Sequence, residues 1–97
     1  MKDNTRKNYE ELNKVLSLAY WRASIGKGRE RHGEGRPFTE QYICKGARRY
    51  GIGALQYQIG KKCEEVSKLP DTQAKINELL DIIVYAAAAV IVLKEEL

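Results

Sequence analysis

Eight basic side chains lie between Arg22 and Arg49, in a stretch that glycine and proline interrupt. Glycine lets backbone N–H groups approach an anion closely, and arginine can hold two phosphate oxygens at once. Residues 24–38, SIGKGRERHGEGRPF, therefore form a candidate phosphate-binding loop, although they do not contain the P-loop pattern. Its candidate ligands are Lys27, Arg29, Arg31, His32 and Arg36. The plainer interpretation is a solvated basic loop with no ligand.

A second basic group follows this loop on a predicted helix. Lys45, Arg48 and Arg49 lie within about one helical turn, next to Tyr50. Aromatic rings and guanidinium planes that lie close together can stack a nucleotide base while the charges hold its phosphate. The same tyrosine spacing is also typical of half-buried core residues. These residues are therefore predicted to reinforce the loop as ligand-binding residues.

Two acids on the last predicted helix are candidate metal ligands. Glu78 and Asp81 are three residues apart, so they lie on neighbouring parts of one helix face. Oxygen ligands of this kind suit Mg²⁺, with help from Glu64 or Glu65 on the preceding helix. Alternatively, Glu78 and Asp81 are ordinary acids that stabilise the amino end of the helix through its dipole.

The elements that carry these residues are predicted to form one all-α domain over residues 1–97. Apolar spacing of three and four residues predicts a helix from about Thr5 to Ala23, capped by Asn4 or Thr5, and a second helix that Thr39 caps. A third helix spans about 54–69, with Leu55, Ile59, Cys63 and Val66 on its apolar side. A fourth spans about 72–96 after a stop and cap at Leu69-Pro70-Asp71. The expected fold is a small bundle of about four helices with a long glycine-rich basic loop.

The last predicted helix contains the longest apolar run, Ile82 to Leu93. These twelve residues are fewer than the roughly 20 that cross a bilayer, so the run predicts a buried helix. Three short companions give it little cover, so we expect a second copy of the chain to complete the bundle as a homo-oligomer. The polar amino end predicts no signal peptide, and two cysteines with one histidine cannot build a four-ligand zinc site, so a reduced cytoplasmic setting is expected.

Charge is distributed unevenly along the chain. Residues 1–50 carry a net charge of +6 and residues 51–97 a net charge of −2, with a pI of about 9.1 for the chain. A basic half favours an anionic partner. Nucleic acid is one alternative, but no predicted helix has the continuously basic face that groove-binding proteins usually present. Binding to another protein through surface alone is a further alternative.

The segment from Tyr50 to Leu93 resembles a known family. Its Tyr50-Gly51 pair, the helix IGKKCEEVSKL and the helix DTQAKINELLDIIVYAAAAVIVL resemble the nucleotide-modification-associated domains of phage genomes. They are more distantly similar to the all-α, MazG-like nucleotide pyrophosphatases. In that family, E-E-x-x-E on one helix and E-x-x-D followed by a tyrosine on the next bind Mg²⁺ for cleavage of nucleoside triphosphates. The resemblance implies Glu64, Glu65, Glu78 and Asp81 as metal ligands here.

One departure from the family pattern separates two hypotheses. Lys68 stands where the third carboxylate of E-E-x-x-E would be, which weakens a metal cluster. We therefore predict a nucleotide-binding protein without a cofactor, of a phage type that sequesters a signalling nucleotide as an anti-defence sponge, in a pocket between subunits. The enzyme alternative is an Mg²⁺-dependent nucleoside triphosphate pyrophosphatase, with Glu30, Glu34 and Glu40 as candidates for the missing acid.

Overall fold

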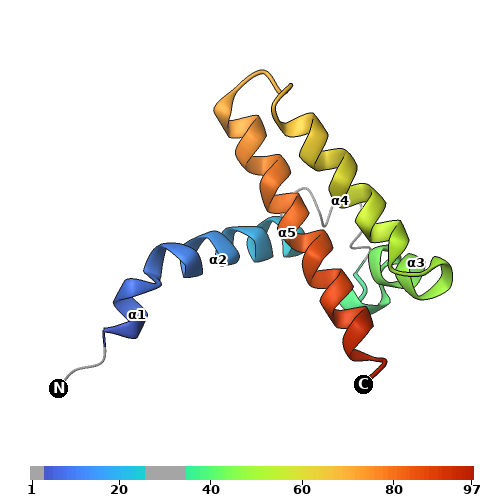
Figure 1. Ribbon diagram of the computed structural model, residues 1–97. Helices are drawn as coiled ribbons and strands as arrows, with labels where there is room; N and C mark the ends of the chain where they lie inside the picture. The colour runs from blue at the N-terminus through green and yellow to red at the C-terminus, as the bar shows by residue number, and fades with distance from the viewer. Residues whose placement is uncertain (1–3, 26–34) are drawn as a thin grey trace.

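All regular structure in the described part of the chain is helical. The computed structural model describes residues 4–25 and 35–97, and no strand occurs in these two ranges. The helices, in chain order, are α1 (Thr5–Asn8), α2 (Glu10–Ser24), the 3-10 helix η2 (Phe38–Glu40), α3 (Tyr42–Tyr50), α4 (Gly53–Val66) and α5 (Thr72–Lys94) (Figure 1). The predicted all-α class is confirmed. Lys27, Arg29, Arg31 and His32 lie outside the described residues.

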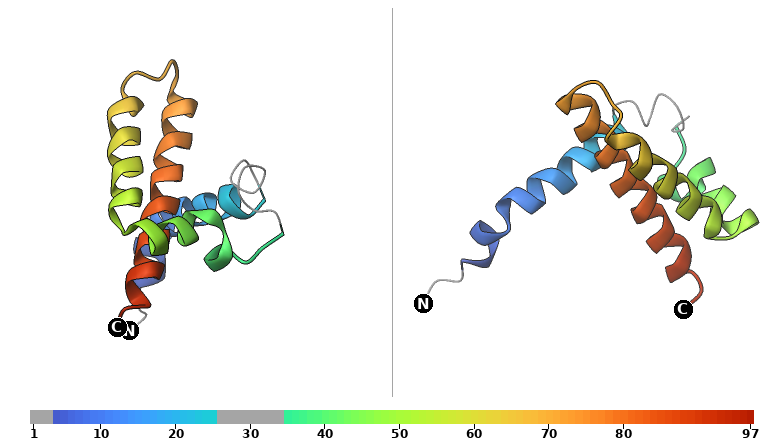
Figure 2. Two further views of the ribbon diagram at one scale, coloured as in Figure 1. Left: turned by 90° about the vertical axis from the view of Figure 1, so that its right-hand side faces the viewer. Right: turned by 45° about the horizontal axis from the view of Figure 1, so that its top comes forward.

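An antiparallel hairpin of α4 and α5 forms the centre of the molecule (Figure 2). The turn between these helices ends at Asp71, whose Oδ1 accepts a hydrogen bond from the Ala74 backbone N–H at 2.7 Å. This is the predicted cap, which satisfies one free N–H group of α5. At the other end of the hairpin, α3 joins α4 through Gly51, whose φ of +91° is a conformation that essentially only glycine adopts.

The core is small and lies where α3 meets the hairpin. Cys44 and Ala47 of α3, Leu55 of α4, and Ala88 and Val92 of α5 are buried together. Ala88 is fully buried, and its small side chain lets α3 approach α5 closely. These few apolar residues hold the hairpin and α3 together.

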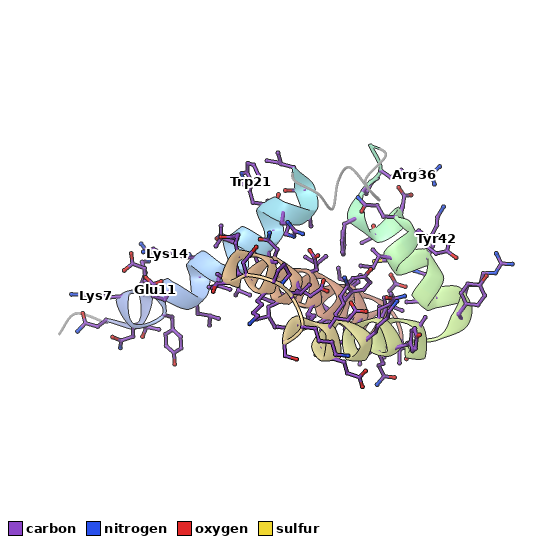
Figure 3. The ribbon with its side chains drawn as sticks, turned by 90° about the horizontal axis from the view of Figure 1, so that it is seen from above. Lys7, Glu11, Lys14, Trp21, Arg36 and Tyr42 are labelled. Atoms are coloured by element: carbon purple, nitrogen blue, oxygen red, sulfur yellow. The ribbon has the colours of Figure 1, made fainter. Side chains whose placement is uncertain are left out.

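The carboxyl-terminal part of α2 is the part that contacts α5. Its amino-terminal half and α1 extend away from the hairpin, on the side opposite α4 (Figures 1 and 2). This part carries exposed Lys7, Glu11 and Lys14, on the opposite side of the view from Arg36 and Tyr42 (Figure 3). The arm increases the radius of gyration to 15.0 Å, against about 12.5 Å for a compact domain of this length.

Three details at the amino ends of helices differ from the sequence-based predictions. The single helix expected from Thr5 is interrupted at Tyr9, and the Asn4 side chain makes no capping hydrogen bond. Thr39 does not cap α3, because it lies inside the 3-10 helix that follows Pro37. Gln41, with extended backbone at ψ 160°, occupies the cap position instead. Local polar residues alone did not identify where the backbone turns.

The face of α4 that packs on α5 is rotated relative to the prediction. Cys63, expected on the apolar side, is exposed, and Lys62, expected on the polar side, is half-buried against α5. Lys62 is drawn inward by an ion pair with Glu78, with 3.0 Å between its Nζ and the carboxylate Oε1. An ion pair between α4 and α5 thus places Lys62, and not Cys63, on the face of α4 that meets α5.

One chain covers α5 only in part, and the predicted cover by a second copy stays a prediction. Only 17% of its most apolar 18-residue window, of mean hydropathy 2.1, is buried. By length and composition alone, α5 is also long and apolar enough to cross a membrane. Leu79, Val90 and Leu93 are each about half exposed. One chain therefore covers one side of α5 and leaves the other open.

The two cysteines should differ sharply in reactivity. Cys44 is fully buried, and this burial raises the pKa of its thiol, whereas Cys63 is exposed. Because the thiolate is the reactive form, maleimide should label one thiol per folded chain within minutes and both in urea, as measured by intact mass. Cys63→Ser should abolish the fast labelling, and fast labelling of that variant would contradict the fold at α3.

Candidate functional site

A cavity of about 600 Å³ lies between the carboxyl end of α2, the segment that contains η2, and the middle of α5. Its walls are predominantly apolar. They comprise Leu16, Ala19, Tyr20, Ala23 and Ser24 from α2, Gly35, Arg36, Phe38 and Gln41 from the η2 segment, and Ile83, Val84, Ala87 and Ile91 from α5. This volume is within the range of small-molecule pockets, which are typically apolar with a few polar groups.

The polar groups of the cavity lie on two of its three walls. On α2, the Ser24 hydroxyl donates to the Tyr20 backbone oxygen at 2.8 Å. On the facing segment, Gln41 Nε2 donates to the Arg36 backbone oxygen at 2.9 Å, which fixes the chain after Gly35. The Arg36 side chain is exposed and has no ion pair within residues 4–25 and 35–97; Figure 3 shows it at the outer edge. A cationic group is therefore available at the cavity rim.

The described cavity walls combine aromatic and aliphatic side chains with few polar groups. The described walls contain two aromatic rings, Tyr20 and Phe38, but no carboxylate, histidine or cysteine. Tyr20 lines the cavity and is 73% exposed, so most of its surface is accessible. A flat, apolar group can lie between these walls while a negative charge meets Arg36.

The acids predicted as metal ligands are instead paired with cations from other helices. Asp81 Oδ1 accepts a hydrogen bond from Arg22 Nε at 2.6 Å, and its Oδ2 accepts one from Arg22 Nη2 at 3.3 Å. Glu78 accepts from Lys62, whose Nζ also lies 5.5 Å from the centre of the Tyr85 ring. The hydrogen bond to Asp81 raises the pKa of Arg22. Each acid thus fastens a helix to α5.

The remaining predicted metal ligands do not complete a cluster. Glu64 is exposed and Glu65 half-exposed on α4. Within the described ranges, no three His, Cys, Asp or Glu side chains lie close enough to share a metal ion. The geometry of one chain gives the Mg²⁺ prediction no support, and it stays a prediction.

The second basic group lies away from the cavity. Arg48 forms two hydrogen bonds with Glu95, the residue that follows α5, at 2.8 and 2.7 Å, and Arg49 lies over the Tyr50 ring at 5.5 Å. Lys45 is exposed, and none of these four predicted ligand-binding residues lines the cavity. Of the predicted ligand-binding residues that the structure describes, only Arg36 does.

Sequence reasoning missed most of the cavity. Phe38 and Gln41 lie just after the glycine-rich stretch, and Ile83, Val84 and Ala87 were interpreted as helix core alone. Tyr20 gave a usable signal, because an aromatic residue directly before a basic loop is a candidate for stacking. The α5 residues gave none, since their role depends on α2 crossing above them.

No family model, no curated protein and no solved structure matches this chain. The resemblance to phage nucleotide-modification-associated domains therefore stays a prediction.

The Arg22–Asp81 pair should contribute strongly to stability. Both side chains are only 20% exposed, so Asp81→Asn leaves a half-buried guanidinium without its charge partner. We expect the free energy of unfolding in urea to fall by about 1–3 kcal/mol. Glu11→Gln is the matched control, because Glu11 pairs with Lys14 at 3.2 Å but is 86% exposed. That change should cost less than about 0.5 kcal/mol, and equal losses would contradict the predicted role.

The Arg48–Glu95 pair should make stability depend on acid pH. The hydrogen bond from Arg48 lowers the pKa of Glu95 in the folded chain. Its contribution is therefore present above the unfolded pKa, about 4.3, and is lost as the pH falls through the lower folded value. In urea unfolding, Glu95→Gln should be less stable than the original chain at pH 7, and the gap should close below about pH 4. Glu64→Gln, at an exposed acid with no ion pair in the described chain, should show no such gap.

Proposed function

We propose that the chain is a cytoplasmic nucleotide-binding protein, active as a homo-oligomer, that holds a phosphate-bearing nucleotide without hydrolysing it. The observation that carries this proposal is the cavity itself, whose aromatic and aliphatic walls are bordered by an exposed cation at Arg36. A base suits the walls between Tyr20 and Phe38, and phosphate suits the rim.

The sequence supports the same assignment of charge. The basic stretch that contains Lys27, Arg29 and Arg31 joins Ile25 to Gly35, and Gly35 lines the cavity. Arg36, the cation at the cavity rim, is therefore preceded in the sequence by three further cations within nine residues. Retention of a nucleotide without turnover is what a sponge for a signalling nucleotide requires, which is the phage anti-defence role that the family resemblance implies.

The pyrophosphatase alternative receives less support from the acids. Glu78 and Asp81 would have to leave Lys62 and Arg22 before they could bind Mg²⁺. Pyrophosphate release from nucleoside triphosphates that requires Mg²⁺, and that Asp81→Asn abolishes although the variant is folded, would establish this alternative.

Tyr20 gives the sharpest test of the binding site. We expect a panel of mono-, di- and triphosphates and cyclic dinucleotides to contain a ligand that raises the melting temperature, because binding to the folded state stabilises it. Tyr20→Ala should lower the affinity for that ligand, measured by calorimetry, about tenfold or more, which is the loss typical of a stacking ring. Its exposure of 73% means that the variant should fold normally.

Matched controls separate binding from stability. Tyr57→Ala removes a ring of similar exposure, 68%, from α4 and away from the cavity, and should keep full affinity. Arg36→Ala should weaken binding, whereas Arg6→Ala on α1 should not. The proposal fails if no nucleotide shifts the melting temperature, or if Tyr20→Ala and Tyr57→Ala bind alike.

A further inference from the structure

One face of α5, continued by Leu97 just beyond it, presents an apolar stripe to solvent, which is interrupted at Ile83, a residue of the cavity wall. The stripe lies opposite buried Ala88 and Val92, which face the rest of the chain. Its members are spaced by three, four or seven residues, and each of these intervals returns to about the same face of a helix. They are Ile76, Leu79, Ala86, Val90, Leu93 and Leu97, all of them exposed.

The solvent-accessible surface area of the chain is larger than that of a compact monomer of the same mass. Its accessible surface is 7563 Å², whereas a compact monomer of 11.1 kDa exposes about 5,700 Å². A standard protein interface removes about 800 Å² from each partner. One such interface is smaller than this excess, to which the extended arm of α1 and α2 also contributes.

We propose that a second copy of this chain covers the stripe, with the two α5 helices antiparallel and a twofold axis at Ala86. The stripe is self-complementary in this direction, because Leu79 then lies opposite the partner's Leu93. The small Ala86 side chain on the axis lets the helices approach closely. This inference does not rest on nucleotide binding, since neither Ala86 nor Leu93 lines the cavity.

Charge favours the antiparallel direction over the parallel one. Lys75 and Glu96 lie at opposite ends of the stripe, and neither has an ion pair in the described part of the chain. Antiparallel packing brings Lys75 to the level of the partner's Glu96. Parallel packing places like charges together at both ends, which is destabilising.

The unpartnered length of α2 fits the same dimer. The α2 face that meets α5 through Ala19 and Arg22 continues towards the amino end as Leu12 and Val15, which are 54% and 40% exposed. Ala19 and Leu12 are about 10.5 Å apart along the helix, and helices packed side by side are 8–10 Å apart. The arm leaves the hairpin on the side opposite α4 (Figure 1), so this face of α2 is not covered by α4 and is available to a second copy.

Cysteine crosslinking tests the axis. In a Cys63→Ser background, which removes the exposed native thiol, Ala86→Cys should give a disulfide-linked dimer under mild oxidation, because the two copies meet at the axis. Leu93→Cys is the control, since it lies seven residues from the axis and about 21 Å from its own copy. Absence of a linked dimer at position 86, or equal linkage at both positions, would overturn the antiparallel arrangement.

Mass measurement tests the surface independently of crosslinking. Analytical ultracentrifugation should give twice 11.1 kDa for the original chain and a monomer for Val90→Glu. Leu18→Glu is the matched control, because Leu18 is 54% exposed, like Val90 at 55%, but lies off the α2 face that meets α5. This variant should stay dimeric. A monomeric original chain, or one that floats with phosphatidylcholine–phosphatidylglycerol vesicles instead of dimerising, would overturn the proposal.

Discussion

The structure depends on covering α5, an apolar helix of 23 residues whose length exceeds what the other helices can shield. Apolar contact alone does not choose which side of such a helix is covered, because its surface is apolar nearly all round. Two acids make the choice. Asp81 holds α2 through Arg22, and Glu78 holds α4 through Lys62, so both companions attach on the sides where a carboxylate requires a cation.

The cavity follows from that attachment. Arg22 fastens the carboxyl end of α2 to α5, while Phe38 packs against the core on the other side of the gap. Between these contacts α5 presents Ala87, one turn after Ile83 and Val84. The small alanine side chain leaves space that a large residue would fill. The same alanine run that permits close packing at Ala88 thus leaves a hollow one residue earlier. The core, at Ala88, and the cavity wall, at Ala87, thus depend on adjacent residues of α5.

Sequence alone predicted the helices well, because apolar spacing and the Asp71 cap are local signals. It did not predict which of two adjacent residues, Lys62 or Cys63, faces α5, since they differ by only about 100° around the helix and the deciding partner is on another element. The Arg22–Asp81 pair spans 59 positions, so no local pattern announces it. The cavity likewise joins three separate segments, and only the aromatic and basic residues near the loop gave a signal.

The two paired acids also bear on the choice between binding and hydrolysis. In a metal-dependent enzyme the carboxylates must be free to meet the ion, and the helices must be held by other contacts. Here Asp81 is engaged through both oxygens, at 2.6 and 3.3 Å, and removal of Arg22 would release the helix that forms one cavity wall. Metal binding at Asp81 and an intact cavity therefore compete within one chain. One ion pair, Arg22–Asp81, thus links the predicted metal ligand to the wall of the cavity.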